Sequence, residues 1–352
     1  MAKIINNKPT VVVDCDGIVY QCDEAILKDL NEKYGTNYTI EDIGVYGFTG
    51  NHILDKKFDY YKDKDFVLNQ PLYPGAKEFV TALQQRCNLY FCTAVMTEGM
   101  SARAEALMRD FNISQSQIII AKDKSLVTAD YFLDDSPYNI ERSIAKHPVL
   151  FRRPWNHDVS GVMSVSKYDD FICFLDYMEH KIPFTGFNPN SIICLVGPSG
   201  CGKTNLLNSV VKNTEYQKIL TYTTAEKEGY NHLDEDEFNL KRNNGFFAET
   251  TVYGGNKYGI SQNTINFMAS SNEHFICATD ICGAMALKNI FADRVAIIYV
   301  SAPKEVLYLN LLRKEMPEKE KVLRLMSIDT EVTNKQFCDL TVKTEEQLLE
   351  IL

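Results

Sequence analysis

Residues 192–204 read Ile192-Ile-Cys-Leu-Val-Gly197-Pro-Ser-Gly-Cys-Gly202-Lys203-Thr204, an apolar run followed by the pattern G-x-x-x-x-G-K-T. The apolar run predicts a buried β-strand, and residues 205–211 (Asn-Leu-Leu-Asn-Ser-Val-Val) predict a helix. In such a strand–loop–helix unit, backbone N–H groups and the helix N-terminus bind the phosphates of a nucleoside triphosphate. Lys203 would neutralise the β- and γ-phosphates, and Thr204 would bind Mg²⁺. The loop residues expected to bind ATP are Gly197, Ser199, Gly200, Cys201, Gly202, Lys203 and Thr204.

Similar apolar or β-branched runs recur on both sides of this loop, each followed by polar residues and a helical stretch. They are residues 11–13, 89–92, 118–121 and 131–133 in the first half, and 275–278 and 295–300 in the second. This alternation is typical of parallel α/β sheets, whose sites lie at the carboxyl ends of the strands. A chain of 352 residues is too long for one hydrophobic core. We therefore predict two three-layer α/β domains, each built on a parallel sheet.

The predicted boundary between the domains lies at residues 181–190. This stretch, Lys-Ile-Pro-Phe-Thr-Gly-Phe-Asn-Pro-Asn, is rich in turn-forming residues and directly precedes the strand that begins at Ile192. We expect a first domain over residues 1–185 and a second over residues 186–352.

The bulk composition indicates an intracellular protein that acts on small anions. The net charge of -10 weighs against a long nucleic-acid footprint, which needs basic patches. No run approaches the roughly 18 apolar residues of a membrane span, and no signal-peptide core follows Met1. Ten cysteines are scattered singly, and Cys15 and Cys201 lie within the two expected catalytic loops. A disulfide there would be disruptive, so we expect a reducing cytoplasm.

In the first half, acidic residues follow the first predicted strand. Asp14 and Asp16 are two positions apart, and such side chains share one face of an extended segment. The next three runs are followed by Thr93, Lys124 and the pair Asp134-Asp135. Carboxylates gathered at one sheet edge repel each other unless a cation lies among them, so this pattern predicts a Mg²⁺ site. Thr93 and Lys124 would hold a phosphate while one carboxylate acts as nucleophile.

The segments that carry these residues resemble the haloacid dehalogenase-like phosphatases, and most closely their 5'(3')-deoxyribonucleotidase branch. The matching segments are residues 14–18, 71–76, 91–93, 122–130, 133–137 and 168–171. The resemblance implies a Rossmann-like domain with a small cap between Asp16 and Pro71. It also implies Asp14 as nucleophile and Asp16 as general acid/base. Mg²⁺ would be held by Asp14, the carbonyl of Asp16 and Asp134, with Asp135 in support.

Three further positions of this half concern phosphate and base binding. Lys122 competes with Lys124, but the family's R/K-D-K pattern favours Lys124 for phosphate. Ala94 stands where this branch often has a second hydroxyl, so phosphate contacts are expected to be fewer. Tyr46 and Phe48, in the predicted cap, are candidates to stack on the base.

The segments after residue 191 resemble guanylate kinase, over roughly residues 191–315. They are residues 221–224, 230–238, 247–249, 255–259 and 279–283. The resemblance implies a P-loop kinase domain in which Glu249 binds the acceptor base and Tyr230 and Tyr258 bind its phosphate. The other residues implied are Thr221 and Asp280 in the base pocket and two lid arginines, Arg313 towards ATP and Arg324 towards the acceptor.

Two departures from that family concern the acceptor. Guanylate kinases read T-T-R-x-x-R where this chain has Thr-Thr-Ala225-Glu-Lys227, so Ala225 replaces one phosphate-binding arginine. Lys227 can stand in for the other, but lysine is a point charge without a bidentate fork. Ile260 stands where a Ser or Thr hydroxyl meets the guanine carbonyl, and an unpaired carbonyl costs about 1–3 kcal/mol. We therefore expect a different or modified nucleotide as acceptor.

Together these features predict a bifunctional enzyme of nucleotide metabolism. A Mg²⁺-dependent 5'-(deoxy)nucleotidase would be joined to an ATP-dependent nucleoside monophosphate kinase, with different bases because a shared base would give a futile cycle. Two alternatives remain open: a nucleic-acid end-healing enzyme with 3'-phosphatase and 5'-kinase activities, and a kinase-like domain that binds nucleotides without catalysis. The expected partners are nucleoside monophosphates and ATP. Neither nucleic acid nor a membrane is expected as a partner, and a homodimer is compatible with the sequence.

Overall fold

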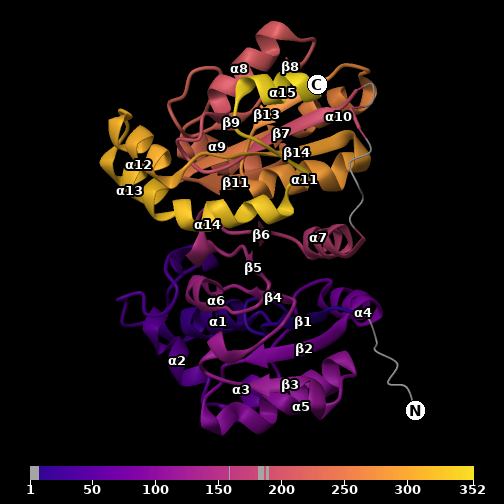
Figure 1. Ribbon diagram of the computed structural model, residues 1–352. Helices are drawn as coiled ribbons and strands as arrows, with labels where there is room; N and C mark the ends of the chain where they lie inside the picture. The colour runs from indigo at the N-terminus through magenta and orange to yellow at the C-terminus, as the bar shows by residue number, and fades with distance from the viewer. Residues whose placement is uncertain (1–7, 158, 181–185, 188–189) are drawn as a thin grey trace, which may run out of the picture. The chain divides into compact units, whose positions relative to one another are not determined.

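The computed structural model describes residues 8–157, 159–180, 186–187 and 190–352, and the chain divides into two compact units (Figure 1). Unit 1 comprises Met1–His157 and Ser164–Ile172, and unit 2 comprises Asp158–Met163 and Cys173–Leu352. The division passes through helix α7 (Tyr168–His180). Of the predicted linker at 181–190, residues 181–185 and 188–189 lie outside the described part of the chain.

Unit 1 contains a six-stranded parallel sheet in the order β3-β2-β1-β4-β5-β6. Its strands are β1 (Thr10–Val13), β2 (Asn88–Thr93), β3 (Ile118–Ile120), β4 (Tyr131–Asp134), β5 (His147–Phe151) and β6 (Ser164–Val165). The valines of β1 are fully buried, as expected of a central strand that is covered on both faces. Because β1, β2 and β4 are parallel neighbours, their carboxyl ends bring Asp14, Thr93 and Asp134 to one edge of the sheet.

The helices of unit 1 follow the strands in α/β fashion, apart from the segment between α1 and α4. The helices are α1 (Cys22–Tyr34), α2 (Lys57–Tyr60), α3 (Lys64–Leu68), α4 (Ala76–Arg86), α5 (Met100–Phe111) and α6 (Pro137–Arg142). The segment between α1 and α4 holds two short 3₁₀ turns and the short helices α2 and α3, within the region where the cap is predicted. Leu27 of α1 packs there with Ile43, Leu54 and Trp155 in a small hydrophobic cluster.

Unit 2 contains a five-stranded parallel sheet in the order β15-β14-β7-β13-β8 and a separate four-stranded sheet in the order β10-β9-β12-β11. The parallel strands are β7 (Ile192–Val196), β8 (Gln217–Lys218), β13 (Phe275–Ala278), β14 (Val295–Val300) and β15 (Leu340–Val342). The four-stranded sheet consists of β9 (Tyr222–Thr223), β10 (Asn231–His232), β11 (Phe247–Tyr253) and β12 (Asn256–Ser261), with β11 and β12 antiparallel. The sequence analysis did not predict this second sheet.

Helices lie on both faces of the parallel sheet in unit 2 (Figure 1). The helices of this unit are α8 (Lys203–Asn213), α9 (Glu235–Asn243), α10 (Gln262–Ser270), α11 (Ile281–Phe291), α12 (Lys304–Arg313), α13 (Glu318–Met326), α14 (Ile328–Thr333) and α15 (Glu345–Ile351). In Figure 1, α8 and α15 lie on one side of this sheet and α11 on the other. Alternate β7 residues, Ile193 and Leu195, pack against Leu206 and Val210 of α8.

The predicted α/β class with two parallel sheets is confirmed, and the strands at 192–196, 275–278 and 295–300 lie where they were predicted. Among the helices of the described residues, none is both long and apolar enough to cross a membrane.

Candidate active sites

The carboxylates at the sheet edge of unit 1 form one compact cluster. Asp14, Asp134 and Asp135 each place an oxygen within 4.8 Å of the others, and all three residues are buried. The ammonium group of Lys124 lies 2.6 Å from Asp14 Oδ1 and 2.8 Å from Asp134 Oδ2. Asn139 Nδ2 donates to both Asp134 oxygens at 3.1 Å and fixes that carboxylate. The structure thus brings together the residues predicted at three separate strand ends.

The cluster carries more negative charge than one lysine can balance. Burial raises the pKa of Asp14 to about 7 despite the opposing charge of Lys124, and Asp134 and Asp16 raise it further. Burial and the neighbouring carboxylates of Asp14 and Asp134 also raise the pKa of Asp135 well above its ordinary value. A divalent cation would relieve both effects, and clustered carboxylate oxygens are the ligands that Mg²⁺ prefers. The residues therefore fit a Mg²⁺ ion.

Thr93, at the end of β2, is fully buried, and its hydroxyl oxygen has no hydrogen-bond partner within the described residues. An unpaired buried hydroxyl is costly, so a ligand oxygen would satisfy it. Gly17 has φ +73°, and a Cβ there would collide with the Asp135 carboxylate, which explains the glycine after Asp16.

Asp16 has a partner that the sequence analysis missed. The guanidinium of Arg103, on α5, is fully buried and lies 2.6 Å from Asp16 Oδ1. It also stacks over the ring of Tyr20, with 4.7 Å to the ring centroid. Arg103 is 87 positions from Asp16, and no local motif marks it.

A cavity of about 370 Å³ opens from this cluster. It is lined by Asp14, Asp16, Lys124 and Asp135 together with Lys122, Ala94, Tyr46, Phe58, Tyr61, Tyr138, Trp155 and the buried pair Asp23 and Lys57, among others. Thr93 and Asp134 are fully buried and are not among its lining residues. Tyr46 lines the cavity as a stacking candidate would. Phe48 does not; it is 72% exposed and packs on Phe58 at 4.2 Å between ring centroids.

The phosphate loop of unit 2 joins β7 to α8, as its motif predicts. Gly197 has φ +154°, and a Cβ there would lie 2.6 Å from the Val300 carbonyl oxygen, so only glycine fits. Lys203 Nζ donates to the carbonyls of Gly197 and, at 3.1 Å, Pro198. Ser199 Oγ bonds to Tyr253 Oη at 2.6 Å and accepts from Arg324 Nη1 at 2.9 Å.

A cavity of about 490 Å³ extends from this loop. The predicted residues that line it are Ser199, Gly200, Gly202, Lys203, Thr204, Thr221, Tyr230, Glu249, Tyr258, Asp280, Arg313 and Arg324. Gly197 and Cys201, which were predicted to bind ATP, do not line it. Gly197 packs under the Val300 carbonyl, and Cys201 packs against hydrophobic clusters beneath the loop. Further lining residues include Lys227, Thr251, Tyr253, Ile260, Cys277, Thr279 and Lys314.

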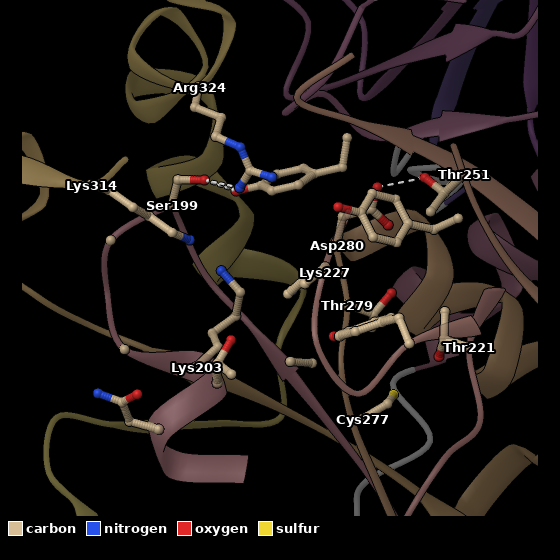
Figure 2. A pocket seen from close by; sticks show the side chains of 18 of the residues that line it. Ser199, Lys203, Thr221, Lys227, Thr251, Cys277, Thr279, Asp280, Lys314 and Arg324 are labelled. Atoms are coloured by element: carbon tan, nitrogen blue, oxygen red, sulfur yellow. Dashed lines mark hydrogen bonds between the residues drawn. The ribbon is translucent and has the colours of Figure 1, made fainter. Parts of the chain in front are cut away.

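Cations gather on one side of this cavity. Figure 2 shows Lys203, Lys314 and Arg324 there, opposite Thr221, Thr251, Cys277 and Asp280. Burial and four neighbouring cations lower the pKa of Lys227 to about 8. Burial and Arg324 also lower the pKa of Lys314, a residue that the sequence analysis did not select. Such mutual repulsion is relieved when phosphates bind between the cations.

On the opposite side, Asp280 caps the N-terminus of α11. Its Oδ1 accepts from Gly283 N at 2.8 Å, and its Oδ2 accepts from Thr251 Oγ1 at 2.5 Å. Burial, together with the nearby charge of Asp280, raises the pKa of Glu249 to about 8. The rings of Tyr230 and Tyr258 pack edge to face near Lys227.

The fold and both sites define a chain of two α/β domains, each with phosphate-binding chemistry at the carboxyl ends of a parallel sheet. Residues 8–175 match the family "5' nucleotidase, deoxy (Pyrimidine), cytosolic type C protein", and residues 189–349 match the guanylate kinase family. The first half of the chain therefore belongs to a nucleotidase family and the second half to the guanylate kinase family.

One curated relative and two solved structures are each similar to part of the chain. The guanylate kinase of Methylobacillus flagellatus is 27% identical over 145 residues, which is 39% of this chain and 72% of that protein. Among solved structures, a guanylate kinase of Anaplasma phagocytophilum aligns with TM-score 0.36 and 18% identity over 46% of this chain and 80% of its own. A haloacid dehalogenase-like hydrolase of Burkholderia xenovorans aligns with TM-score 0.33 and 15% identity over 46% of this chain and 94% of its own.

Proposed function

We propose that the protein is a bifunctional enzyme of nucleotide metabolism. Unit 1 hydrolyses a 5'-(deoxy)nucleoside monophosphate with Mg²⁺, and unit 2 transfers a phosphoryl group from ATP to a nucleoside monophosphate of another base. The observation that carries the proposal is that each cavity gathers the charged groups its reaction needs: Asp14, Asp16, Asp135 and Lys124 line one, and phosphate-loop residues with converging cations line the other. The description of the family that residues 8–175 match contains the words deoxy and pyrimidine. We therefore propose a pyrimidine deoxynucleoside monophosphate as the substrate of unit 1.

In unit 1, the Asp14 carboxylate attacks phosphorus while the bond to the 5'-oxygen breaks, which gives an acyl phosphate on Asp14. Asp16 donates a proton to the departing 5'-oxygen and then takes one from the water that attacks the acyl phosphate. Inorganic phosphate leaves, and Asp14 is restored. Thr93 and Lys124 hold the phosphate oxygens during both steps. Mg²⁺, held by Asp14, the Asp16 carbonyl and Asp134, would supply positive charge to the transferring group.

In unit 2, the phosphate loop binds the ATP phosphates, with Lys203 on the transferring group and Thr204 as a ligand of the Mg²⁺ that accompanies ATP. Lys227 and Arg324 hold the acceptor phosphate, and Arg313 with Lys314 contacts the donor side. Phosphoryl transfer depends on positioning and charge stabilisation, so the convergence of these cations on one cavity supports the assignment.

Two substitutions in the full chain test the proposal. Asp14→Asn keeps the shape of the side chain but removes its nucleophilic charge, so phosphate release should fall at least about a hundredfold while ATP-dependent transfer persists. Lys203→Ala should have the converse effect, since it removes the charge that meets the transferring phosphoryl group. Both are assayed against all common nucleoside monophosphates. Near-normal hydrolysis by Asp14→Asn would contradict the proposed nucleotidase activity of unit 1. Near-normal transfer by Lys203→Ala would contradict the proposed kinase activity of unit 2.

A further inference from the structure

A single arginine interrupts the buried face of helix α5 in unit 1. The buried residues of this helix are Ala102, Arg103, Ala106, Leu107 and Phe111. Their spacing is that of one helix face, and all of them except Arg103 are apolar. Arg103 is nevertheless completely buried. A charge at such a position destabilises the fold unless it is paired, so the partners of Arg103 indicate why an arginine stands there.

The hydrogen bonds of Arg103 single out Asp16. Arg103 Nη2 donates to Asp16 Oδ1 at 2.6 Å. Arg103 Nε and Nη1 are buried, and neither has a hydrogen-bond partner in the described part of the chain. Unpaired buried donors are unfavourable, and an apolar side chain of similar size would avoid them. Packing therefore does not explain the arginine, and the ion pair with Asp16 does.

The guanidinium of Arg103 is also held against the loop that carries Asp16. It lies over the ring of Tyr20, with 4.7 Å to the ring centroid. The carbonyl of Tyr20 accepts from Gly17 N at 3.1 Å and so closes this loop. The hydroxyl of Tyr20 donates to Asp110, on α5, at 3.0 Å. The helix that bears Arg103 is thus tied to the same turn of the chain as Asp16.

The two carboxyl oxygens of Asp16 have different surroundings. Oδ1 accepts from Arg103, whereas no hydrogen-bond partner of Oδ2 occurs among the described residues. Asp16 lines the nucleotidase cavity together with Asp14 and Lys124, and its side chain is 19% exposed. Arg103 is fully buried and does not line that cavity. A carboxyl group that is held by one oxygen from the protein side leaves the other oxygen for the cavity.

We propose that Arg103 is a positioning residue for the nucleotidase reaction, which holds Asp16 Oδ1 so that Oδ2 is directed at the departing 5'-oxygen. This inference rests on the proposed nucleotidase activity of unit 1. With Oδ1 accepting from Arg103, the proton of the Asp16 acid lies on Oδ2. That proton passes to the 5'-oxygen as the P–O bond breaks, and the carboxylate that remains keeps its pair with Arg103. Arg103 itself does not touch the substrate.

Two substrates that differ in one atom test this role. Thymidine 5'-monophosphate loses an alkoxide, which needs a proton, whereas the 5'-S-phosphate of 5'-thiothymidine loses a thiolate, which does not. The value of kcat/KM covers the reaction only up to departure of the nucleoside, so it excludes the later hydrolysis of the acyl phosphate. In the full chain, Arg103→Met should lower kcat/KM for the oxygen ester at least about tenfold, and for the sulfur ester less than about threefold. Unfolded molecules would lower both values equally, so the ratio of the two does not depend on how much of the variant is folded.

Two further variants separate positioning from a structural role. Arg103→Lys keeps a cation and should recover part of the ratio. The double variant Asp16→Asn with Arg103→Met should show the same ratio as Asp16→Asn alone, because the arginine acts only through Asp16. An equal loss for both esters in Arg103→Met, or a further fall of the ratio in the double variant, would overturn the inference and leave the nucleotidase proposal standing. Wild-type protein that released phosphate from neither ester would overturn the nucleotidase proposal, and this inference with it.

Discussion

Thr93 offers a test in which stability and activity change in opposite directions. Its side chain is fully buried, and its hydroxyl has no partner within the described residues. Such a hydroxyl costs about 1–3 kcal/mol, and valine has nearly the same shape with a high preference for strands. Thr93→Val should therefore raise the free energy of unfolding by about 1–2 kcal/mol. For a domain of this size that is a rise in melting temperature of about 2–8 °C, measurable by calorimetry of the unit 1 transition.

The same substitution removes a proposed contact to the substrate phosphate. A hydrogen bond to a charged group contributes about 1.5–3 kcal/mol, so kcat/KM for phosphate release should fall about 10–150-fold while ATP-dependent transfer is unchanged. Thr93→Ser is the matched control, since it keeps the hydroxyl and loses only a methyl group. It should hydrolyse nearly as well as wild type and be less stable. A Thr93→Val protein with lower stability and normal hydrolysis would refute the reasoning.

Other predictions concern unit 2 and the division of the chain. Lys227→Ala should raise KM for the acceptor at least about tenfold through loss of a phosphate contact, and Lys227→Arg should restore binding. Because the pKa of Lys227 is lowered from 10.5 to about 8, its charge destabilises the fold below pH 8, and this penalty disappears between pH 8 and 10.5. The affinity for the acceptor should therefore weaken as the pH rises from 8 to 10.5. The Lys227→Arg variant keeps its charge, so its affinity should not change over this range. The same loss of affinity in that variant would show that Lys227 does not bind the acceptor phosphate. Separately expressed residues 1–185 and 186–352 should each keep their activity, but 186–352 should melt below the full chain, since Asn334 Nδ2 donates to the Gly161 carbonyl at 3.3 Å.

The sites could be predicted from the sequence wherever a local pattern carries the chemistry. The phosphate loop is continuous, and the acidic cluster follows from strand ends that parallel pairing brings together. The two-residue strands β9 and β10 were missed because pairing, of β9 with β12 and of β10 with β9, makes them strands rather than their composition. Arg103 and Lys314 were missed for a similar reason. Arg103 is a lone cation within α5, and Lys314 directly follows Arg313 at the end of α12; no local motif marks either, and only the tertiary fold directs each to a site.

The two sites balance charge in opposite ways, and this predicts how each depends on metal. Unit 1 gathers carboxylates whose pKa values are raised first by burial and then by the charges of one another, so the proposed metal would have to bind before a phosphate dianion could approach. The cavity of unit 2 is lined by an excess of cations, and in the proposed reaction its Mg²⁺ would arrive with ATP. Chelation by EDTA should therefore abolish binding of the nucleotidase substrate, measured calorimetrically with the Asp14→Asn variant, whereas the acceptor of unit 2 should still bind. Acceptor binding that fails without metal would show that the cations of unit 2 are insufficient by themselves.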